Sequence, residues 1–148
     1  RRENQMYKLN TFKVSFVAEK SLGIITKAEE TVPILRSIFT TLDADQDHFV
    51  ILSRSAKNKV TGYKIISSGG KTQCLVDPAI VFRSAIVLGA VNIILAHNHP
   101  SGDSEPSVQD KELTKRLKSG GEILNIPILD HIILGCKTEY SFTEQKII

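Results

Sequence analysis

The sequence predicts one α/β domain, in which a mixed β-sheet is flanked by helices. A chain of 148 residues fits a single domain that buries most of its apolar surface. Its 41% hydrophobic and 24% charged residues are typical of a globular protein. Short β-rich runs alternate with helical patterns in the order β-α-β-β-α-β-α-β, which favours a sheet covered by helices.

The N-terminal elements are predicted to be a strand and a helix. Residues 8–19 alternate polar and apolar side chains, which is typical of a strand with one buried face. Residues 26–42 carry apolar side chains at helical spacing, and Thr26 with Glu29 has the form of a capping box. Because Pro33 belongs in a first turn, a helix start near Thr31 is the alternative.

The middle of the chain predicts a hairpin and a second helix. Residues 43–47 are acidic and indicate a loop, and the β-rich runs 48–54 and 60–67 indicate a hairpin. Residues 78–89 predict a helix with Asp77 as its N-cap. The side chains expected to face the core are Ile80, Val81, Ala85 and Leu88.

The C-terminal half predicts alternating strands and one helix. Residues 91–96 are almost all apolar, which indicates a strand buried on both faces. A loop leads to a helix over residues 107–119, which two glycines are expected to close. Residues 126–134 predict another apolar strand, and residues 140–148 a short strand or tail.

Charge and cysteine content limit the kinds of function and site that the sequence supports. A net charge of +3 does not by itself indicate nucleic acid, and the basic cluster on the 107–119 helix is interpreted as a solvated face. Cys74 and Cys136 lack paired spacing, so we expect buried apolar groups and neither a disulfide nor a metal site. Without a membrane-spanning run or a signal-peptide pattern, a cytoplasmic protein is expected.

One segment carries the chemistry. His97 and His99 stand where the buried strand ends, before Pro-Ser-Gly, and Asp110 lies in the first turn of the next helix. Two imidazoles and a carboxylate suit Zn²⁺, and three protein ligands leave a fourth position open, as in catalytic zinc sites. The alternative is that the histidines are polar loop residues and that Asp110 only caps its helix.

The spacing of this segment resembles that of a known family. His97-x-His99-Pro100, six residues, Ser107, two residues and Asp110 is similar to the signature of the JAB/MPN (JAMM) metalloproteases. The longer string from residue 97 to 103 resembles the RadC family of that superfamily, as do segments 129–135 and 141–142. Residues 1–148 are therefore interpreted as a single RadC-like JAB/MPN domain, with its core from about residue 26 and an extra strand at about 8–19. The helix-hairpin-helix region common in RadC proteins is not expected in this sequence.

The resemblance implies a fold and a set of roles. The fold is the JAB/MPN fold, a cytidine-deaminase-like three-layer architecture. His97, His99 and Asp110 take the positions of zinc ligands, with water as the fourth. Ser107 takes the position of the serine that stabilises the oxyanion; the alternative is a helix N-cap, and we expect one hydroxyl to serve only one of these roles fully.

The superfamily also has a carboxylate on an earlier strand, which takes a proton from the zinc-bound water. Alignment places Asp47 there, where glutamate is usual; aspartate reaches about 1.5 Å less far. A general base must approach its proton's heavy atom to about 2.6–3.2 Å, and its loss costs about 10²–10⁴ in rate. The alternative is that Asp47 is a solvated loop carboxylate beside Asp43 and Asp45.

The remaining polar residues have simpler interpretations. His131, in an apolar strand, is expected to be a core histidine with satisfied hydrogen bonds. His48 should point away from Asp47, because neighbouring side chains of a strand face opposite sides. Asp103 either braces the loop or is a turn residue.

These observations predict zinc-dependent hydrolysis of a peptide or isopeptide bond, with a peptide or protein as substrate. A nucleic-acid-binding module is the second hypothesis, since RadC proteins are traditionally labelled DNA repair proteins. A nuclease is the third, suggested by the letters His-Asn-His, although HNH nucleases spread these residues over a ββα unit. A scaffold that keeps the metal only for folding is the fourth.

Overall fold

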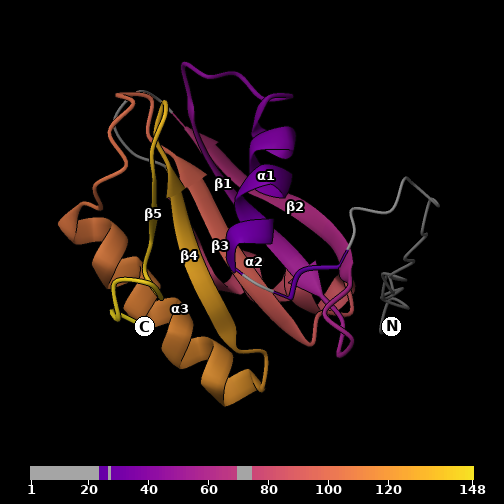
Figure 1. The fold of residues 1–148 in the computed structure, drawn as a ribbon. Helices are drawn as coiled ribbons and strands as arrows, with labels where there is room; N and C mark the ends of the chain where they lie inside the picture. The colour runs from indigo at the N-terminus through magenta and orange to yellow at the C-terminus, as the bar shows by residue number, and fades with distance from the viewer. Residues whose placement is uncertain (1–23, 27, 70–74) are drawn as a thin grey trace, which may run out of the picture.

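The protein is described by a computed structural model over residues 24–26, 28–69 and 75–148, so the predicted strand at 8–19 lies outside the described residues. The described part contains one five-stranded mixed sheet of order β2-β1-β3-β4-β5 (Figure 1). β3 and β4 are parallel, and all other neighbours are antiparallel. The strands are β1 (Asp47–Arg54), β2 (Val60–Gly69), β3 (Asn92–Asn98), β4 (Ile128–Leu134) and β5 (Glu139–Ser141).

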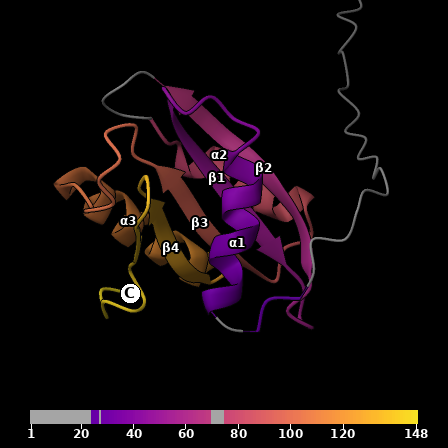
Figure 2. The same cartoon turned by 45° about the horizontal axis from the view of Figure 1, so that its top comes forward.

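Helices cover both faces of this sheet and make three layers. The helix α1 (Ala28–Phe39) lies on one face, and α2 (Pro78–Val87) and α3 (Val108–Leu124) lie on the other (Figures 1 and 2). Each face has its own apolar core: Leu35 and Ile38 of α1 pack on one side, and Val81, Phe82 and Leu117 on the other. The predicted mixed sheet flanked by helices is confirmed.

Local sequence signals explain where α2 begins. Asp77 is its N-cap and accepts a hydrogen bond from the backbone of Ala79 at 2.9 Å, as predicted. The predicted core face is wrong at one position: Ile80 is 38% exposed, and Phe82 is buried in its place. The cause is α3, against which the Phe82 ring packs.

The helix α1 begins earlier than its proline indicates. It starts at Ala28, which puts Pro33 in the second turn. The carboxylate that accepts hydrogen bonds from the backbone and hydroxyl of Thr26 belongs to Glu30, one residue beyond the predicted partner Glu29. The side chain of Glu29 is not among those that the structure describes, so the predicted capping box stays a prediction.

The prediction that two glycines close the last long helix is wrong. Gly120 and Gly121 lie within α3, which ends at Leu124 and is capped by Asn125 in the left-handed conformation at φ 56°. A Cβ atom at Gly120 would lie 2.8 Å from the Phe82 ring, and one at Gly121 would lie 2.5 Å from the carbonyl oxygen of residue 126. The glycines thus allow close packing and do not end the helix.

Asp47, the two cysteines and the lengths of the helices are the remaining features on which the sequence made predictions. Asp47 is the first residue of β1 and not part of the preceding loop. Cys136 is exposed, so its predicted burial is wrong, while Cys74 lies outside the described residues. Among the described helices, none has both the length and the apolar character that crossing a bilayer requires.

Candidate metal centre

Two histidines and one aspartate meet at the C-terminal end of β3. Nε2 of His97 lies 2.9 Å from Nε2 of His99 and 3.3 Å from Oδ1 of Asp110. Nε2 of His99 lies 3.2 Å from Oδ2 of Asp110. All three ligand atoms lie within 4.8 Å of one another, which is close enough to hold a metal ion.

The strand itself brings the two imidazoles together. His97 is the penultimate residue of β3, and the backbone of His99 continues the pairing by donating to the carbonyl of Leu134 at 3.1 Å. Residues two positions apart on a strand point to the same face, which brings the two rings together. Their centroids are 4.8 Å apart.

A capping box orients the aspartate. The Ser107 hydroxyl accepts from the backbone of Asp110 at 3.1 Å, and Oδ2 of Asp110 accepts from the backbone of Ser107 at 2.8 Å. Ser107 is thus the N-cap of α3. Capping uses a lone pair of the hydroxyl and not its proton, so the expectation that the two roles of Ser107 exclude each other does not hold.

The hydrogen bonds of His99 determine which nitrogen faces the aspartate. Its Nδ1 lies 2.8 Å from the backbone carbonyl of Asp103, which can only accept, so Nδ1 carries a proton. Asp103 therefore braces the loop through its backbone. In the neutral ring, Nε2 then presents a lone pair to the site.

The charges of the site favour a cation. The hydrogen bond to Asp110 raises the pKa of His99 above its usual value despite burial, with further support from the Asp103 carbonyl and the charges of Asp110 and Asp47. Burial opposes ionisation of Asp110, but the contacts of its carboxylate with His97, with His99 and with the backbone N–H of Ser107 hold its pKa well below the usual range. A proton or a metal ion satisfies the same arrangement.

The donor set fits zinc. Tetrahedral ligands at zinc bond lengths are about 3.3 Å apart. Here the two Nε2 atoms are 2.9 Å apart, and each lies 3.2 or 3.3 Å from its own oxygen of the Asp110 carboxylate. Two imidazole nitrogens and one carboxylate oxygen are ligands that zinc accepts. The geometry shows that these residues can hold a metal ion.

Asp47 lies beside this cluster. Its side chain shares a hollow of about 210 Å³ with His97 and Asp110, and the residue is only 7% exposed. The alternative of a solvated loop carboxylate is therefore wrong. His48, the next residue, contacts Ser68 Oγ at 2.6 Å and lines a different hollow, which agrees with the predicted alternation.

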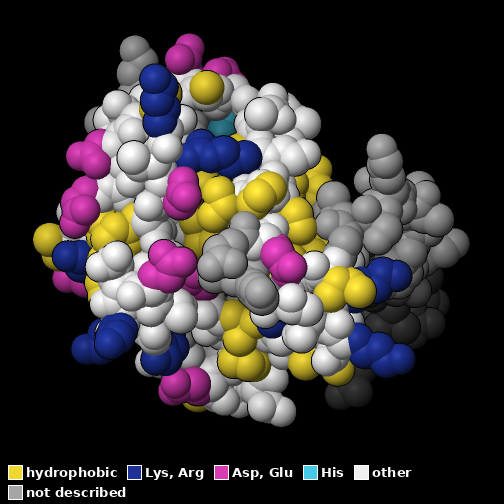
Figure 3. Space-filling view, viewed as in Figure 1, with side chains coloured by type: hydrophobic (Ala, Val, Ile, Leu, Met, Phe, Trp, Pro, Cys, Tyr) yellow, Lys and Arg dark blue, Asp and Glu magenta, His cyan; other side chains and the backbone are white. Residues whose placement is uncertain are grey.

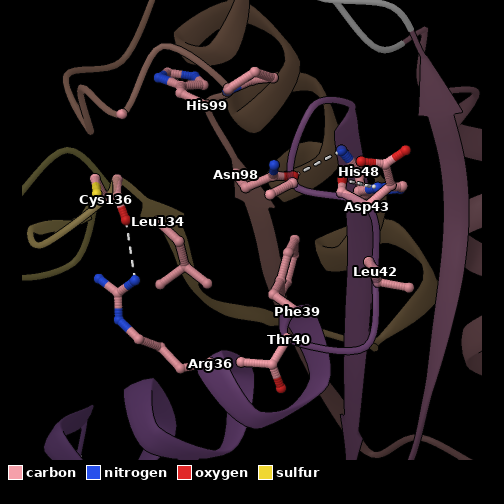
Figure 4. A pocket seen from close by; sticks show the side chains of 14 residues that line it. Arg36, Phe39, Thr40, Leu42, Asp43, His48, Asn98, His99, Leu134 and Cys136 are labelled. Atoms are coloured by element: carbon pink, nitrogen blue, oxygen red, sulfur yellow. Dashed lines mark hydrogen bonds between the residues drawn. The ribbon is translucent and has the colours of Figure 1, made fainter.

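Asn98, between the two histidines, is a site residue that the sequence analysis missed. Its side chain donates to the carbonyl of Gln46 and accepts from the backbone of His48, each at 2.8 Å. Figure 4 shows the second of these bonds. The amide thus holds the backbone on both sides of Asp47. Because these partners lie 52 and 50 residues away, only the strand pairing reveals them.

His131 is the second residue whose place was missed. It is fully buried with both nitrogens hydrogen bonded, so the predicted core histidine is confirmed. Its Nε2, however, lies 2.8 Å from Nδ1 of His97. Burial, assisted by the nearby His97, lowers the pKa of His131 well below its usual value. The sequence feature that could have indicated this contact is that two apolar strands, which pair in the sheet, each carry a histidine.

A larger hollow of about 410 Å³ adjoins His99 on the side of α1. Figure 4 shows His99 and Asn98 of the β3 end on one side of it and Phe39 and Leu134 on others. On the face in Figure 3, histidine appears only as a small recessed area. His97 is buried and His99 and Asp110 are partly buried, so the cluster is set below the surface, and it borders both hollows.

Comparison with known proteins gives the family. Residues 25–147 match the family described as the RadC-like JAB domain. A UPF0758 protein of Flavobacterium johnsoniae is 37% identical over 145 residues, covering 90% of this chain and 63% of that protein. A UPF0758 protein of Desulfitobacterium hafniense is 45% identical over 104 residues, covering 70% and 46%. One of Trichormus variabilis is 44% identical over 100 residues, covering 68% and 41%.

These matches agree with the geometry. The family match includes the whole segment from β1 to β5, so the converging side chains lie inside the matched region. The chain spans 41% to 63% of the length of these three curated relatives. On this fold and these matches, the chain belongs to the RadC-like JAB domain family.

Proposed function

We propose that this domain is a zinc-dependent hydrolase that cleaves peptide or isopeptide bonds. The observation that carries the proposal is the convergence of three ligand atoms within 4.8 Å beside a buried carboxylate. His97, His99 and Asp110 would hold the ion. When bound, zinc lowers the pKa of a water ligand and polarises a carbonyl group.

Asp47 supplies the proton transfer. Its carboxylate shares the hollow with His97 and Asp110, where a water that attacks the substrate carbonyl would stand. A carboxylate oxygen of Asp47 takes the proton of that water and later delivers it to the leaving amine nitrogen. Asn98, which binds the backbone on both sides of Asp47, holds this carboxylate in position.

Ser107 supplies a donor to the developing oxyanion. The hydroxyl caps α3 by accepting from Asp110, which leaves the O–H proton for donation. Loss of one oxyanion donor typically costs about 10²–10³ in rate. The capping contact gives this hydroxyl a fixed position at the start of the helix.

Zinc content and cleavage of a peptide library test the proposal. We expect His97→Ala to lose zinc and activity, because two donors remain. Asp47→Asn should keep zinc and lose about 10²–10⁴ in rate, and Asp47→Glu should retain cleavage. His48→Ala is the matched control, since this side chain faces the other hollow and should leave zinc content unchanged.

Three outcomes would overturn the proposal. Unchanged zinc in His97→Ala would remove the ligand assignment. Bound zinc without cleavage in wild type and Asp47→Glu would leave a metal-binding scaffold. Salt-dependent DNA binding with a slope of several phosphates, without cleavage, would favour the nucleic-acid-binding module.

A further inference from the structure

A buried chain of hydrogen bonds leads away from the second nitrogen of His97. Nδ1 of His97 contacts Nε2 of His131 at 2.8 Å, and Nδ1 of His131 contacts Oγ1 of Thr114 at 2.6 Å. Thr114 in turn donates to the backbone carbonyl of Asp110 at 2.6 Å. The chain therefore starts at one candidate ligand, crosses from β3 to β4 and α3, and returns to another.

The direction of each hydrogen bond follows from the last acceptor in the series, the backbone carbonyl of Asp110. A carbonyl only accepts, so the single hydroxyl proton of Thr114 is used on Asp110. The contact between Thr114 and His131 is a hydrogen bond only if Nδ1 of His131 donates. His131 thus carries its proton on Nδ1.

The same reasoning extends to His97. His131 is fully buried and packs against the rings of Phe142 and Phe49, with centroids 4.8 and 5.6 Å away, so its neutral form is favoured. Its Nε2 then has only a lone pair, and His97 must donate to it from Nδ1. This leaves the Nε2 lone pair of His97 directed toward His99 and Asp110.

We propose that Thr114 and His131 are positioning residues, which set His97 in the tautomer that presents the Nε2 lone pair to the metal ion. The inference rests on the metal-binding part of the proposed function and not on hydrolysis. Neither residue touches the converging ligand atoms. Partners of this kind typically change metal affinity by about 10–100-fold when they are removed.

Thr114→Val tests the inferred direction of these hydrogen bonds. Valine keeps the shape of threonine but removes the hydroxyl, so His131 loses its acceptor and is free to carry its proton on Nε2 instead. His97 would then accept at Nδ1 and carry its own proton on Nε2, facing the site. We expect zinc affinity, measured by competition with a chromophoric chelator, to fall about 10–100-fold.

Two variants serve as controls. Thr114→Ser restores the hydroxyl and should restore the affinity, which a loss of packing alone would not do. Ser119→Ala removes a hydroxyl from the same helix with the same kind of contact, to the carbonyl of Lys115, and should leave affinity unchanged. Thermal unfolding of the metal-free variants checks that each is folded.

Nitrogen NMR of the imidazoles gives a second test that needs no metal. We expect the spectrum of the wild type to show protonated Nδ1 and unprotonated Nε2 in His97 and His131. Thr114→Val should invert both. A wild-type spectrum with a proton on Nε2 of His131 would overturn the inference, even if the valine variant did not fold.

Unchanged zinc affinity in a folded Thr114→Val protein would also overturn the inference that Thr114 and His131 set the tautomer of His97. Failure of the proposed function can be distinguished from these results. Zinc binding without peptide cleavage in the wild type would refute hydrolysis and leave the tautomer assignment standing. A wild type without zinc would refute the metal site. The imidazole spectrum would still show whether the hydrogen bonds from His97 through His131 to Thr114 run in the inferred direction.

Discussion

At the scale of single residues, Asp110 combines a structural and a chemical contact in one carboxylate. Oδ2 accepts from the backbone of Ser107 while also facing His99, and Oδ1 faces His97. These contacts keep the pKa of Asp110 well below its usual range, so the carboxylate stays ionised. The raised pKa of His99 has the opposite consequence, because a proton at its Nε2 competes with a metal ion.

Zinc affinity should therefore depend on pH through His99. Below its raised pKa, the metal must displace one proton, and we expect affinity to fall about tenfold per pH unit; above that pKa, affinity should level off. Chelator competition between about pH 5 and 8 measures this curve. A flat curve across that range would contradict the raised pKa of His99.

Some residues of the site could be predicted from the sequence, and others could not. His97, His99 and Asp110 lie within 14 consecutive residues, so spacing alone predicted that they meet. His131 and Asn98 depend on strand pairing across 34 to 52 residues, which spacing does not reveal. Their partners are visible only once the sheet order is known.

At the scale of elements, the start of α3 serves both the fold and the site. The capping box that begins the helix also directs Asp110 toward the histidines. Ser107→Ala should remove one half of this box and destabilise the metal-free protein by about 1 kcal/mol. Urea denaturation measures the loss.

Two further variants make this result specific to the cap. Ser107→Asn should recover most of the stability, because asparagine is an equally good N-cap residue. Ser119→Ala, in the exposed part of the same helix, should stay within about 0.5 kcal/mol of the wild type. A Ser107→Ala protein as stable as the wild type would show that the box contributes nothing.

The same helix shows why element boundaries are hard to predict. A Gly-Gly pair after a helical pattern usually indicates an end, because glycine is favoured at C-caps. Here the neighbouring Phe82 and the carbonyl of residue 126 leave no room for a Cβ, so packing and not termination selects the glycines. The contact of Gly120 with Phe82 joins distant segments and leaves no local signal, whereas Gly121 packs against the chain that follows its own helix.

At the scale of the whole molecule, the metal cluster joins two layers. His97 belongs to the sheet and Asp110 to the helical layer of α2 and α3, so a shared ion would cross-link them. Zinc at about 100 times its Kd should stabilise the fold by about 2.7 kcal/mol. A domain of this size should then unfold about 5–10 °C higher.

Thermal unfolding with zinc and with a chelator measures this difference. The His97→Ala protein should show no zinc-dependent rise, and a rise of equal size there would place the stabilising ion elsewhere. A mixed sheet covered by helices was predictable from the order of strands and helices, and the three layers were implied by the resemblance to the JAB/MPN fold. The depth of the cluster between two hollows was not, since it depends on how α1 and α3 border the sheet.

The way Asn98 holds the start of β1 has a consequence for the register of that strand. Sliding β1 by one position would exchange the two faces of the strand and bring His48 or Gln46 to the place of the buried carboxylate. The side-chain amide of Asn98 binds the carbonyl of Gln46 and the N–H of His48, so it adds two hydrogen bonds on either side of Asp47 in the observed alignment. The segment that supplies the imidazoles thus also binds the strand that carries Asp47, and an error in strand alignment would remove the carboxylate from its place beside them while leaving the sheet intact.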